Sequence, residues 1–160
     1  MDNDKEFLEY ILKLGKIKDV EEAFKEFPPE NEWHEGKIGN VVQDNEEEYS
    51  KFNIGDIVFV KSYKYKDGTE GRNHLFVIIS QNNLAVPIEN FCMLISSQIE
   101  KVKYDANVDL KKDNLNHLKK DSIVKTDIIY KITDKQILFK VGEVTMDKVE
   151  EYRELYKKLN

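Results

Sequence analysis

The pattern of hydrophobic and polar positions predicts two short helices near the N-terminus. Apolar residues recur at helical spacing over residues 4–14, and Gly15 is suited to end that helix. A second helix is predicted over residues 20–27, where two consecutive prolines stop it. Residues 30–50 show no clear period, and we interpret them as a linker or arm.

The pattern changes near Phe52, where strand-length apolar runs begin. Strands are predicted over residues 57–63, 74–81, 91–97, 106–109, 122–128 and 136–144. The second and third runs contain unbroken apolar stretches, residues 75–79 and 91–95, which are typical of central strands buried on both faces. A polar loop is predicted over residues 64–73, and one or two helical turns over residues 113–119, with Leu115 and Leu118 facing inward.

The last helix is the clearest of the predicted elements. Thr145 is a favourable N-cap, and an apolar stripe follows it at Val149, Tyr152, Leu155 and Leu159. Several short strands with one terminal helix fit a half-open barrel. They do not fit a parallel α/β sheet, because few of the strands are separated by a helix. The predicted class is therefore mainly β (α+β).

The net charge of −6 is divided unevenly along the 160 residues. Residues 1–50 hold 15 acidic and 6 basic side chains, a net of −9, whereas residues 51–160 hold 16 acidic and 19 basic ones, a net of +3. We therefore predict an acidic helical extension and linker over residues 1–50. A mildly basic barrel domain, able to meet an anionic partner, is predicted over residues 51–160.

Composition argues against several classes of protein. The N-terminus lacks the basic start and apolar stretch of a signal peptide, and no apolar run approaches the roughly 20 residues that cross a membrane. The single cysteine, Cys92, lies in an apolar run and is predicted to be a buried thiol. Together these features indicate the cytoplasm. No phosphate-binding loop or zinc-ligand spacing is found, so neither a metal nor a cofactor is expected.

Five segments of the chain resemble, in order, those of the MazF/PemK/Kid toxin family. The family opens with Gly-Asp or Gly-Glu before an apolar strand, followed by a polar loop and an Arg-Pro step into a second strand. A third strand with a Thr/Ser pair, a Val-Val-x-x-Asp segment and a closing strand with a C-terminal helix complete the pattern. The matching segments here are Ile54–Val60, Asp67–Ser80, Met93–Ser97, Ser122–Asp127 and Lys140–Thr145.

This resemblance implies an SH3-like half-open barrel of the MazF/PemK type that usually dimerises. Here the barrel would carry the C-terminal helix and the N-terminal helical extension. Many family members are metal-independent endoribonucleases that cut single-stranded RNA. They are usually neutralised by an acidic antitoxin protein that occupies the RNA groove. The expected partners are therefore single-stranded RNA, an antitoxin and a second copy of the chain.

The resemblance also implies candidate site residues. The family's catalytic arginine falls on His74 without gaps and on Arg72 with a shift of two, and its proline is missing here. A later arginine and aspartate of the family, two residues apart, match Lys125 and Asp127. The predicted catalytic residues are Arg72, His74 and Asp127, and the predicted substrate-binding residues are Lys125, Ser96, Tyr65 and Ser80.

Metal-independent RNA cleavage needs a base, a cation and an acid. Histidine titrates near neutral pH, so His74 suits the base or the acid, and Arg72 suits the cation that offsets phosphate charge. Asp127 suits a base or an orienting group, and Lys125 a phosphate contact. On one continuous strand these last two side chains would share a face. Tyr65, beside the polar loop, suits stacking on a base.

Two questions stay open at this stage. The barrel is an enzyme, which requires Arg72, His74 and Asp127 to meet in one groove, a non-catalytic module that binds nucleic acid or protein, or a purely structural domain with no groove. Residues 1–50 either act like an antitoxin within the same chain or cap an open edge of the barrel.

Overall fold

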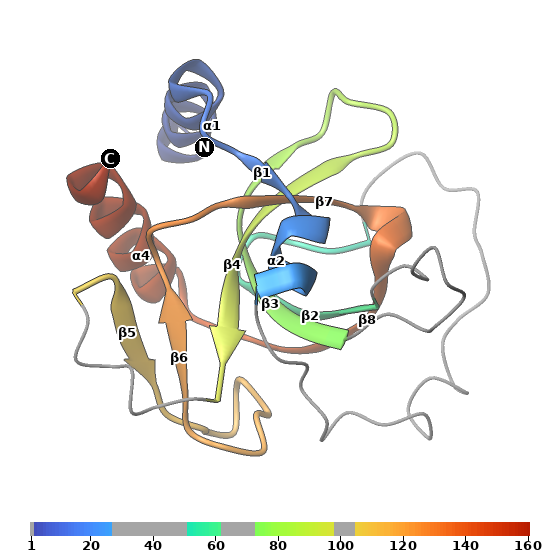
Figure 1. The fold of residues 1–160 in the computed structure, drawn as a ribbon, viewed down its shortest axis with the longest axis vertical. Coiled ribbons are helices and arrows are strands. Elements are labelled where there is room, and N and C mark those ends of the chain that lie inside the picture. The colour runs from blue at the N-terminus through green and yellow to red at the C-terminus, as the bar shows by residue number, and fades with distance from the viewer. Residues whose placement is uncertain (1, 27–50, 62–72, 98–104) are drawn as a thin grey trace.

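The short apolar runs form a curved sheet with helices packed against it in the computed structural model (Figure 1), which describes residues 2–26, 51–61, 73–97 and 105–160. The helices are α1 (Asp2–Leu14), α2 (Val20–Glu26) and α4 (Met146–Leu159), and a 3₁₀ turn, η2, covers Asp134–Gln136. The strands are β1 (Lys18–Asp19), β2 (Asp56–Lys61), β3 (Asn73–Asn82), β4 (Glu89–Ser96), β5 (Asn107–Leu110), β6 (Ser122–Lys125), β7 (Tyr130–Thr133) and β8 (Ile137–Glu143).

The helices form where the periodicity predicts them. α1 buries Phe7 and Ile11, whereas Leu12, at the margin of the predicted stripe, is 47% exposed. The end of the predicted second helix, residue 27, lies outside the described residues. In α4 the predicted N-cap is confirmed, because the side-chain oxygen of Thr145 accepts a hydrogen bond from the backbone N–H of Lys148 at 3.4 Å.

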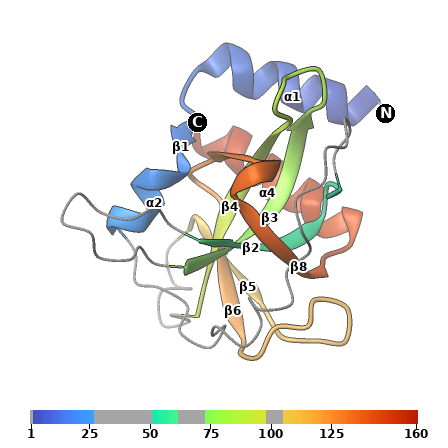
Figure 2. The ribbon, with the colours of Figure 1, turned by 90° about the vertical axis from the view of Figure 1, so that its right-hand side faces the viewer.

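Strand order explains how the sheet curves towards a half-open barrel. The order is β1-β7-β4-β3-β2-β8, and β6 joins β4 to β5. Only the short β1–β7 pair among the described strands is parallel. β3 occupies one edge of β4, while β7 and β6 share the other edge, one along each half of β4. Figure 2 shows the paired strands β5 and β6 at the end of the molecule opposite α1. The predicted α+β barrel with a C-terminal helix and N-terminal helices is therefore confirmed.

One predicted strand is wrong in its extent. Residues 122–128 form not a single strand but β6, a turn at Thr126 and Asp127, and then the approach to β7. The backbone N–H and the side-chain hydroxyl of Thr126 both donate to the carbonyl of Ala106, at 2.9 and 2.6 Å. These two bonds to Ala106 hold the turn at the end of β6, where pairing with one half of β4 stops, and the chain then pairs with the other half of β4 as β7.

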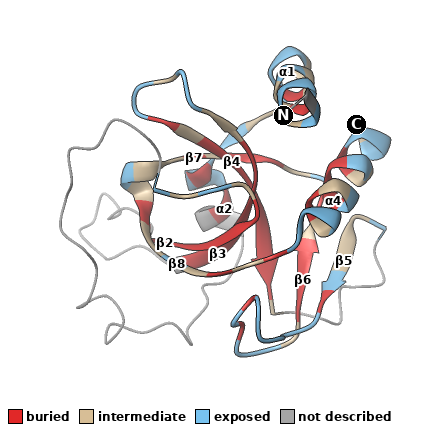
Figure 3. Ribbon diagram, turned by 180° about the vertical axis from the view of Figure 1, so that it is seen from behind, coloured by how far each residue is buried: buried red, intermediate tan, exposed pale blue. Residues whose placement is uncertain are grey.

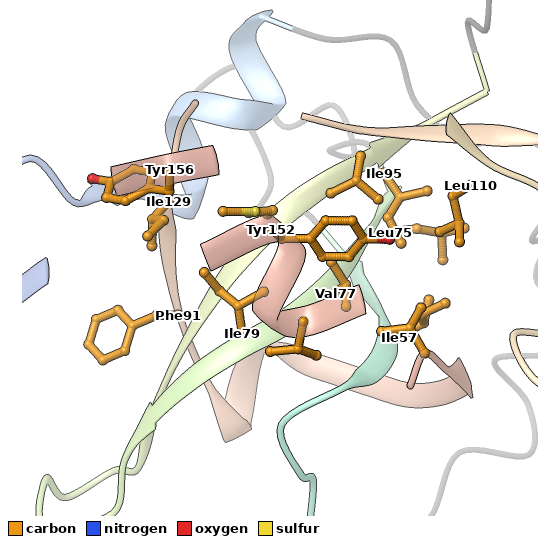
Figure 4. Packing of buried hydrophobic residues seen from close by; sticks show 14 of the residues in the cluster. Ile57, Leu75, Val77, Ile79, Phe91, Ile95, Leu110, Ile129, Tyr152 and Tyr156 are labelled. Atoms are coloured by element: carbon orange, nitrogen blue, oxygen red, sulfur yellow. The ribbon is translucent and has the colours of Figure 1, made fainter. Parts of the chain in front are cut away.

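The two central strands are buried on both faces, as their continuous apolar runs predict. Along β3, Leu75, Val77 and Ile79 face a larger core with α1, α4 and β5, while Phe76 and Ile78 face a smaller core with α2. Figure 4 shows the side chains of the larger core gathered beneath α4, and Figure 3 shows buried positions concentrated in the middle of the sheet. Cys92 lies fully buried in the smaller core, as expected.

At a bulge in β3, the side chain of Arg153 connects the C-terminal helix α4 to the N-terminal helix α1. The register shifts between Ile78 and Ser80, which leaves the carbonyl of Ile79 outside the β4 ladder. The buried guanidinium of Arg153 donates two hydrogen bonds to that carbonyl, at 3.0 and 2.8 Å, and pairs with Asp4 of α1 at 3.0 Å. Arg153 also stacks over the ring of Phe7, 5.2 Å from its centroid.

The connection between β5 and β6 departs from expectation. Residues 114–116 form a turn rather than the predicted helical turns over 113–119. Leu118 points inward as predicted, at 7% exposure, but the prediction for Leu115 is wrong, because this residue is 40% exposed. The reason is local: Asp113 and Asn116 hydrogen-bond the backbone of this segment and so compete with a helix.

Candidate functional site

Two predicted site residues meet at the end of the sheet where β3 begins and β4 ends. His74 is the Cα partner of Val60 in β2 and precedes Leu75, the partner of Ile95. The next residue of β4 after Ile95 is Ser96, so continuation of the register places His74 opposite Ser96. His74 is 1% exposed, and its ring lies 6.3 Å from that of Phe76.

Lys125 shares a face of the sheet with these two residues. Ser96 pairs with Ile123 of β6, and antiparallel partners project from the same face. Lys125 follows Ile123 by two residues and therefore also projects from that face. The face continues onto β5 at Asp109, the partner of Ile123, whose carboxylate pairs with Lys111 at 3.4 Å.

Asp127 and Ser80 do not join this group. β6 runs away from Ser96, and Asp127 is exposed in the turn after the strand, so it does not alternate with Lys125 on one face. Ser80 lies six residues along β3 from His74, roughly 20 Å at the rise of a strand. Its hydroxyl is buried and has no hydrogen-bond partner among the described residues.

The remaining predicted residues, Arg72 and Tyr65, lie outside the described residues. Arg72 directly precedes Asn73, the first residue of β3 and the Cα partner of Lys61.

The Gly-Asp pair that opens the family pattern has a structural role. Gly55 has φ +99°, which favours glycine, and its N–H and carbonyl bond to Ile78 and Val144 at 2.8 Å each. The carboxylate of Asp56 accepts the N–H of Asn53 at 2.8 Å and pairs with Lys140 at 3.2 Å. This motif fixes the entry into β2 rather than supplying a reactive group.

The surroundings of Lys140 and Cys92 shift the pKa values of both side chains. Burial lowers the pKa of Lys140, but hydrogen bonds and charges from Asp56 and then Glu143 outweigh it, so the pKa is raised overall. Burial, with a smaller effect from the charge of Asp134, raises the pKa of the Cys92 thiol well above its ordinary value. Cys92 is therefore a packed side chain and not a thiolate nucleophile.

Side chains able to ligate a metal are dispersed in the described parts of the chain. Across residues 2–26, 51–61, 73–97 and 105–160, His, Cys, Asp and Glu side chains are nowhere grouped in threes or more as a metal site requires. The described groups able to contact an anion at the His74 end of the sheet are the imidazole, the Ser96 hydroxyl and the Lys125 ammonium. An imidazole, a hydroxyl and an ammonium together suit a phosphate group.

Comparison with known proteins decides the family. The family of PemK-like, MazF-like toxins of type II toxin–antitoxin systems matches residues 53–159. The chain belongs to this family. The match begins just before β2 and ends at the last residue of α4, so it covers the barrel together with its C-terminal helix. No curated protein matches the chain.

Membership in the PemK-like family places the chain with toxins that are paired with an antitoxin. The helices α1 and α2 precede the matched segment, yet Phe7 and Ile11 lie in its larger core, and Val20 and Ala23 lie in its smaller one. The division at residue 51 stays a prediction. None of the described helices is long and apolar enough to span a membrane.

Proposed function

We propose that this PemK-like protein is a metal-independent endoribonuclease that cleaves single-stranded RNA, with His74, Arg72 and Lys125 at its site. The observation that carries the proposal is that His74, Ser96 and Lys125 share one face and one end of a PemK-like barrel. Arg72 is included because the family resemblance assigns it and because it directly precedes Asn73, the first residue of β3, in the sequence. A phosphate bound there contacts hydroxyl and cationic groups together.

In the proposed reaction the 2′-hydroxyl of the substrate attacks the neighbouring phosphorus. A bond from the 2′ oxygen to phosphorus forms, the bond from phosphorus to the 5′ oxygen breaks, and a 2′,3′-cyclic phosphate results. A base takes the 2′ proton and an acid returns a proton to the 5′ oxygen, and His74 fits either role. Arg72 and Lys125 offset the charge that develops on the phosphate oxygens.

Burial of His74 sets a condition on this chemistry. At 1% exposure the imidazole is shielded from solvent, so RNA reaches it only when the site opens. Opening on binding is a common way to complete a catalytic site and to keep it dry. His74 is also held in a strand with partners on both sides, which fixes its position.

The test is cleavage of a mixed-sequence single-stranded RNA by the full-length protein in EDTA. We expect cleavage to persist in EDTA and to fall by about 10²–10⁴-fold in His74→Gln, the usual contribution of a general acid or base. Arg72→Ala and Lys125→Gln should also slow cleavage. Lys135→Gln, an exposed lysine in η2, serves as the control.

Each variant should first be compared with the wild type by circular dichroism, because His74 is buried. Intact RNA after incubation with the folded wild-type protein would overturn the enzyme proposal. Cleavage that EDTA abolishes and Mg²⁺ restores would overturn its metal independence. Full activity in folded His74→Gln would remove His74 from the site.

A second candidate function is a non-catalytic barrel that binds RNA or a protein partner. The position of Asp127 favours it, because this predicted catalytic residue lies in an exposed turn and not beside His74. Under this proposal the wild-type protein shifts RNA in a binding assay without cutting it, and Asp127→Asn changes nothing.

A further inference from the structure

The connection between β5 and β6 is rich in lysine, although the whole chain is acidic. We call residues 111–121 the basic loop. It carries four lysines, all exposed: Lys111, Lys112, Lys119 and Lys120. Figure 3 shows this connection mostly exposed, at the end of the β5–β6 hairpin. A dense group of lysines in a protein of net charge −6 is a local feature of this surface.

Two polar side chains of the basic loop, Asp113 and Asn116, hydrogen-bond its backbone. One oxygen of Asp113 accepts the N–H groups of Leu115 and Asn116, at 2.9 and 2.7 Å. The Asn116 side chain accepts from the N–H groups of Asp113 and Leu118, both at 3.0 Å, and donates to the carbonyl of Lys111 at 2.8 Å. The loop is therefore ordered before any partner binds.

Contacts with β8 and the core fix the basic loop to the barrel. The N–H of Glu143 donates to the carbonyl of Leu115 at 3.2 Å, and Leu118 is buried. Gly142 packs so closely on the Asn116 backbone that a side chain there would overlap it. The loop is held both by hydrogen bonds within its own backbone and by its contacts with β8 and the core. It therefore presents its lysines in a fixed arrangement, which lowers the entropic cost of binding.

His117 is the one described residue other than glycine with a positive φ, at 55°. The left-handed conformation costs a non-glycine residue roughly 1–2 kcal/mol, and asparagine or glycine adopts it more readily. The side chain of His117 is exposed and does not repay this cost through burial. Strained residues that persist on a rigid support often belong to binding sites.

The basic loop adjoins the face that carries His74 and Ser96. Lys120 precedes Ile123, the strand partner of Ser96, by three residues, which span at most about 11 Å. At the other end of the loop, Lys111 pairs with Asp109, which faces the same way as Ile123. The lysines of the basic loop therefore border the Ser96 end of the proposed site.

We propose that the basic loop is a second contact surface for single-stranded RNA, at which Lys111, Lys112, Lys119 and Lys120 hold backbone phosphates and His117 contacts a base or phosphate. This inference rests on the proposed function and extends it beyond the catalytic face. The loop sets how tightly longer RNA binds and leaves the chemical step unchanged.

The test compares the wild type with K111Q/K112Q/K119Q/K120Q and a matched control, K13Q/K16Q/K135Q/K158Q, which removes four exposed lysines elsewhere. Binding and cleavage are measured with RNAs of roughly 6 and 30 nucleotides, since single-strand sites cover about 4–16 nucleotides. For the longer RNA we expect the loop variant to bind about three- to tenfold more weakly. Its salt slope should be lower by about 0.7 for each phosphate that the loop no longer neutralises. Cleavage of the shorter RNA should match the wild type.

His117→Asn isolates the side chain, because asparagine keeps the left-handed backbone. We expect it to weaken binding of the longer RNA without lowering the thermal midpoint, because asparagine adopts this backbone more readily than histidine. Equal binding and equal salt slopes for the loop variant and its control would overturn the inference while leaving the enzyme proposal standing. Weaker binding of longer RNA by the loop variant, with a wild-type protein that never cleaves, would support the loop and overturn the enzyme. No RNA binding by the wild type would overturn both.

Discussion

At the scale of single residues, close packing decides which substitutions the barrel tolerates. Gly142 lies against the backbone of Asn116, which is held by its own hydrogen bonds and cannot move aside. We expect Gly142→Ala to lower the free energy of unfolding by about 1–3 kcal/mol, the usual cost of overpacking. Urea denaturation measures the change.

Gly15 provides the comparison for Gly142. It has φ +73° with nothing within 4 Å of an added Cβ, so Gly15→Ala carries only the conformational cost of about 1–2 kcal/mol. If Gly142→Ala were as stable as the wild type, the loop backbone would be free to shift.

A buried phenol links stability to alkaline pH. Burial, helped by the charge of Glu151, raises the pKa of Tyr152 above its ordinary value of 10.0. The folded chain keeps this proton where the unfolded chain loses it. The phenol's contribution is therefore complete below about pH 10 and is lost as pH rises further, at up to about 1.4 kcal/mol per pH unit.

Tyr152→Phe should reduce that alkaline loss. The Tyr152 hydroxyl is buried without a hydrogen-bond partner among the described residues, so at pH 7 we expect the variant to be as stable as the wild type or about 1 kcal/mol more stable. Thermal melts between pH 7 and 11 measure both effects. A loss of stability at pH 7 would show that the hydroxyl has a favourable partner.

At the scale of elements, Arg153 joins α1, β3 and α4. Replacing it with methionine leaves the Ile79 carbonyl buried without its donor and releases Asp4. We expect Arg153→Met to lower the free energy of unfolding by about 3 kcal/mol, because the buried Ile79 carbonyl loses two hydrogen bonds from a charged donor. Hydrogen exchange should show α1 amides exchanging faster than those of β4.

Asp4→Asn is the milder comparison, because Asp4 is 32% exposed and its charge is screened. It should cost less than about 1 kcal/mol. Equal costs for the two variants would mean that the ion pair, and not the bonds to Ile79, carries the stabilisation.

The element scale also shows what a sequence reveals. Continuous apolar runs identify β3 and β4, and the capped amphipathic pattern identifies α4, because burial imposes those patterns directly. The break at Thr126 is not visible in the sequence, since it depends on a bond to Ala106, which is distant along the chain. For the same reason the pairing of Ser96 with Ile123, which places Lys125 on the same face of the sheet as His74, does not follow from spacing. The lysine pairs flanking Asn116 are a visible signal of the basic loop, although the pattern does not show its rigidity.

At the scale of the whole molecule, the N-terminal helices belong to the packed core. Phe7, Ile11, Val20 and Ala23 are at most 2% exposed. Deleting residues 1–26 should lower the free energy of unfolding by more than about 5 kcal/mol, since burial of each larger apolar side chain contributes about 1.5–3 kcal/mol. That loss is comparable with the total stability of many domains, so we expect a largely unfolded product by circular dichroism. A folded product of native stability would show that the barrel is independent.

To test whether the acidic extension acts as an antitoxin within the same chain, substitutions are needed that leave the fold intact. Glu6, Glu9, Glu21 and Glu22 are exposed on α1 and α2. Replacing them with glutamine should leave RNA binding unchanged if these helices serve only to pack the core. Removing four negative charges also strengthens RNA binding in general, and the salt dependence of binding measures that effect. If the variant binds RNA at least threefold more tightly than this general effect accounts for, inhibition within the chain is supported.

The contact between Asp4 and Arg153 has a consequence for how the protein is made. The two residues are separated by almost the entire chain, so α1 cannot find its final place until α4 has been synthesised. At about 5–20 residues per second, the apolar side of α1 waits roughly 7–30 s for its partner. A contact of such long range also slows folding, because the entropy of closing a large loop is lost before the contact can stabilise the structure. The nascent chain therefore spends most of its synthesis with an incomplete barrel.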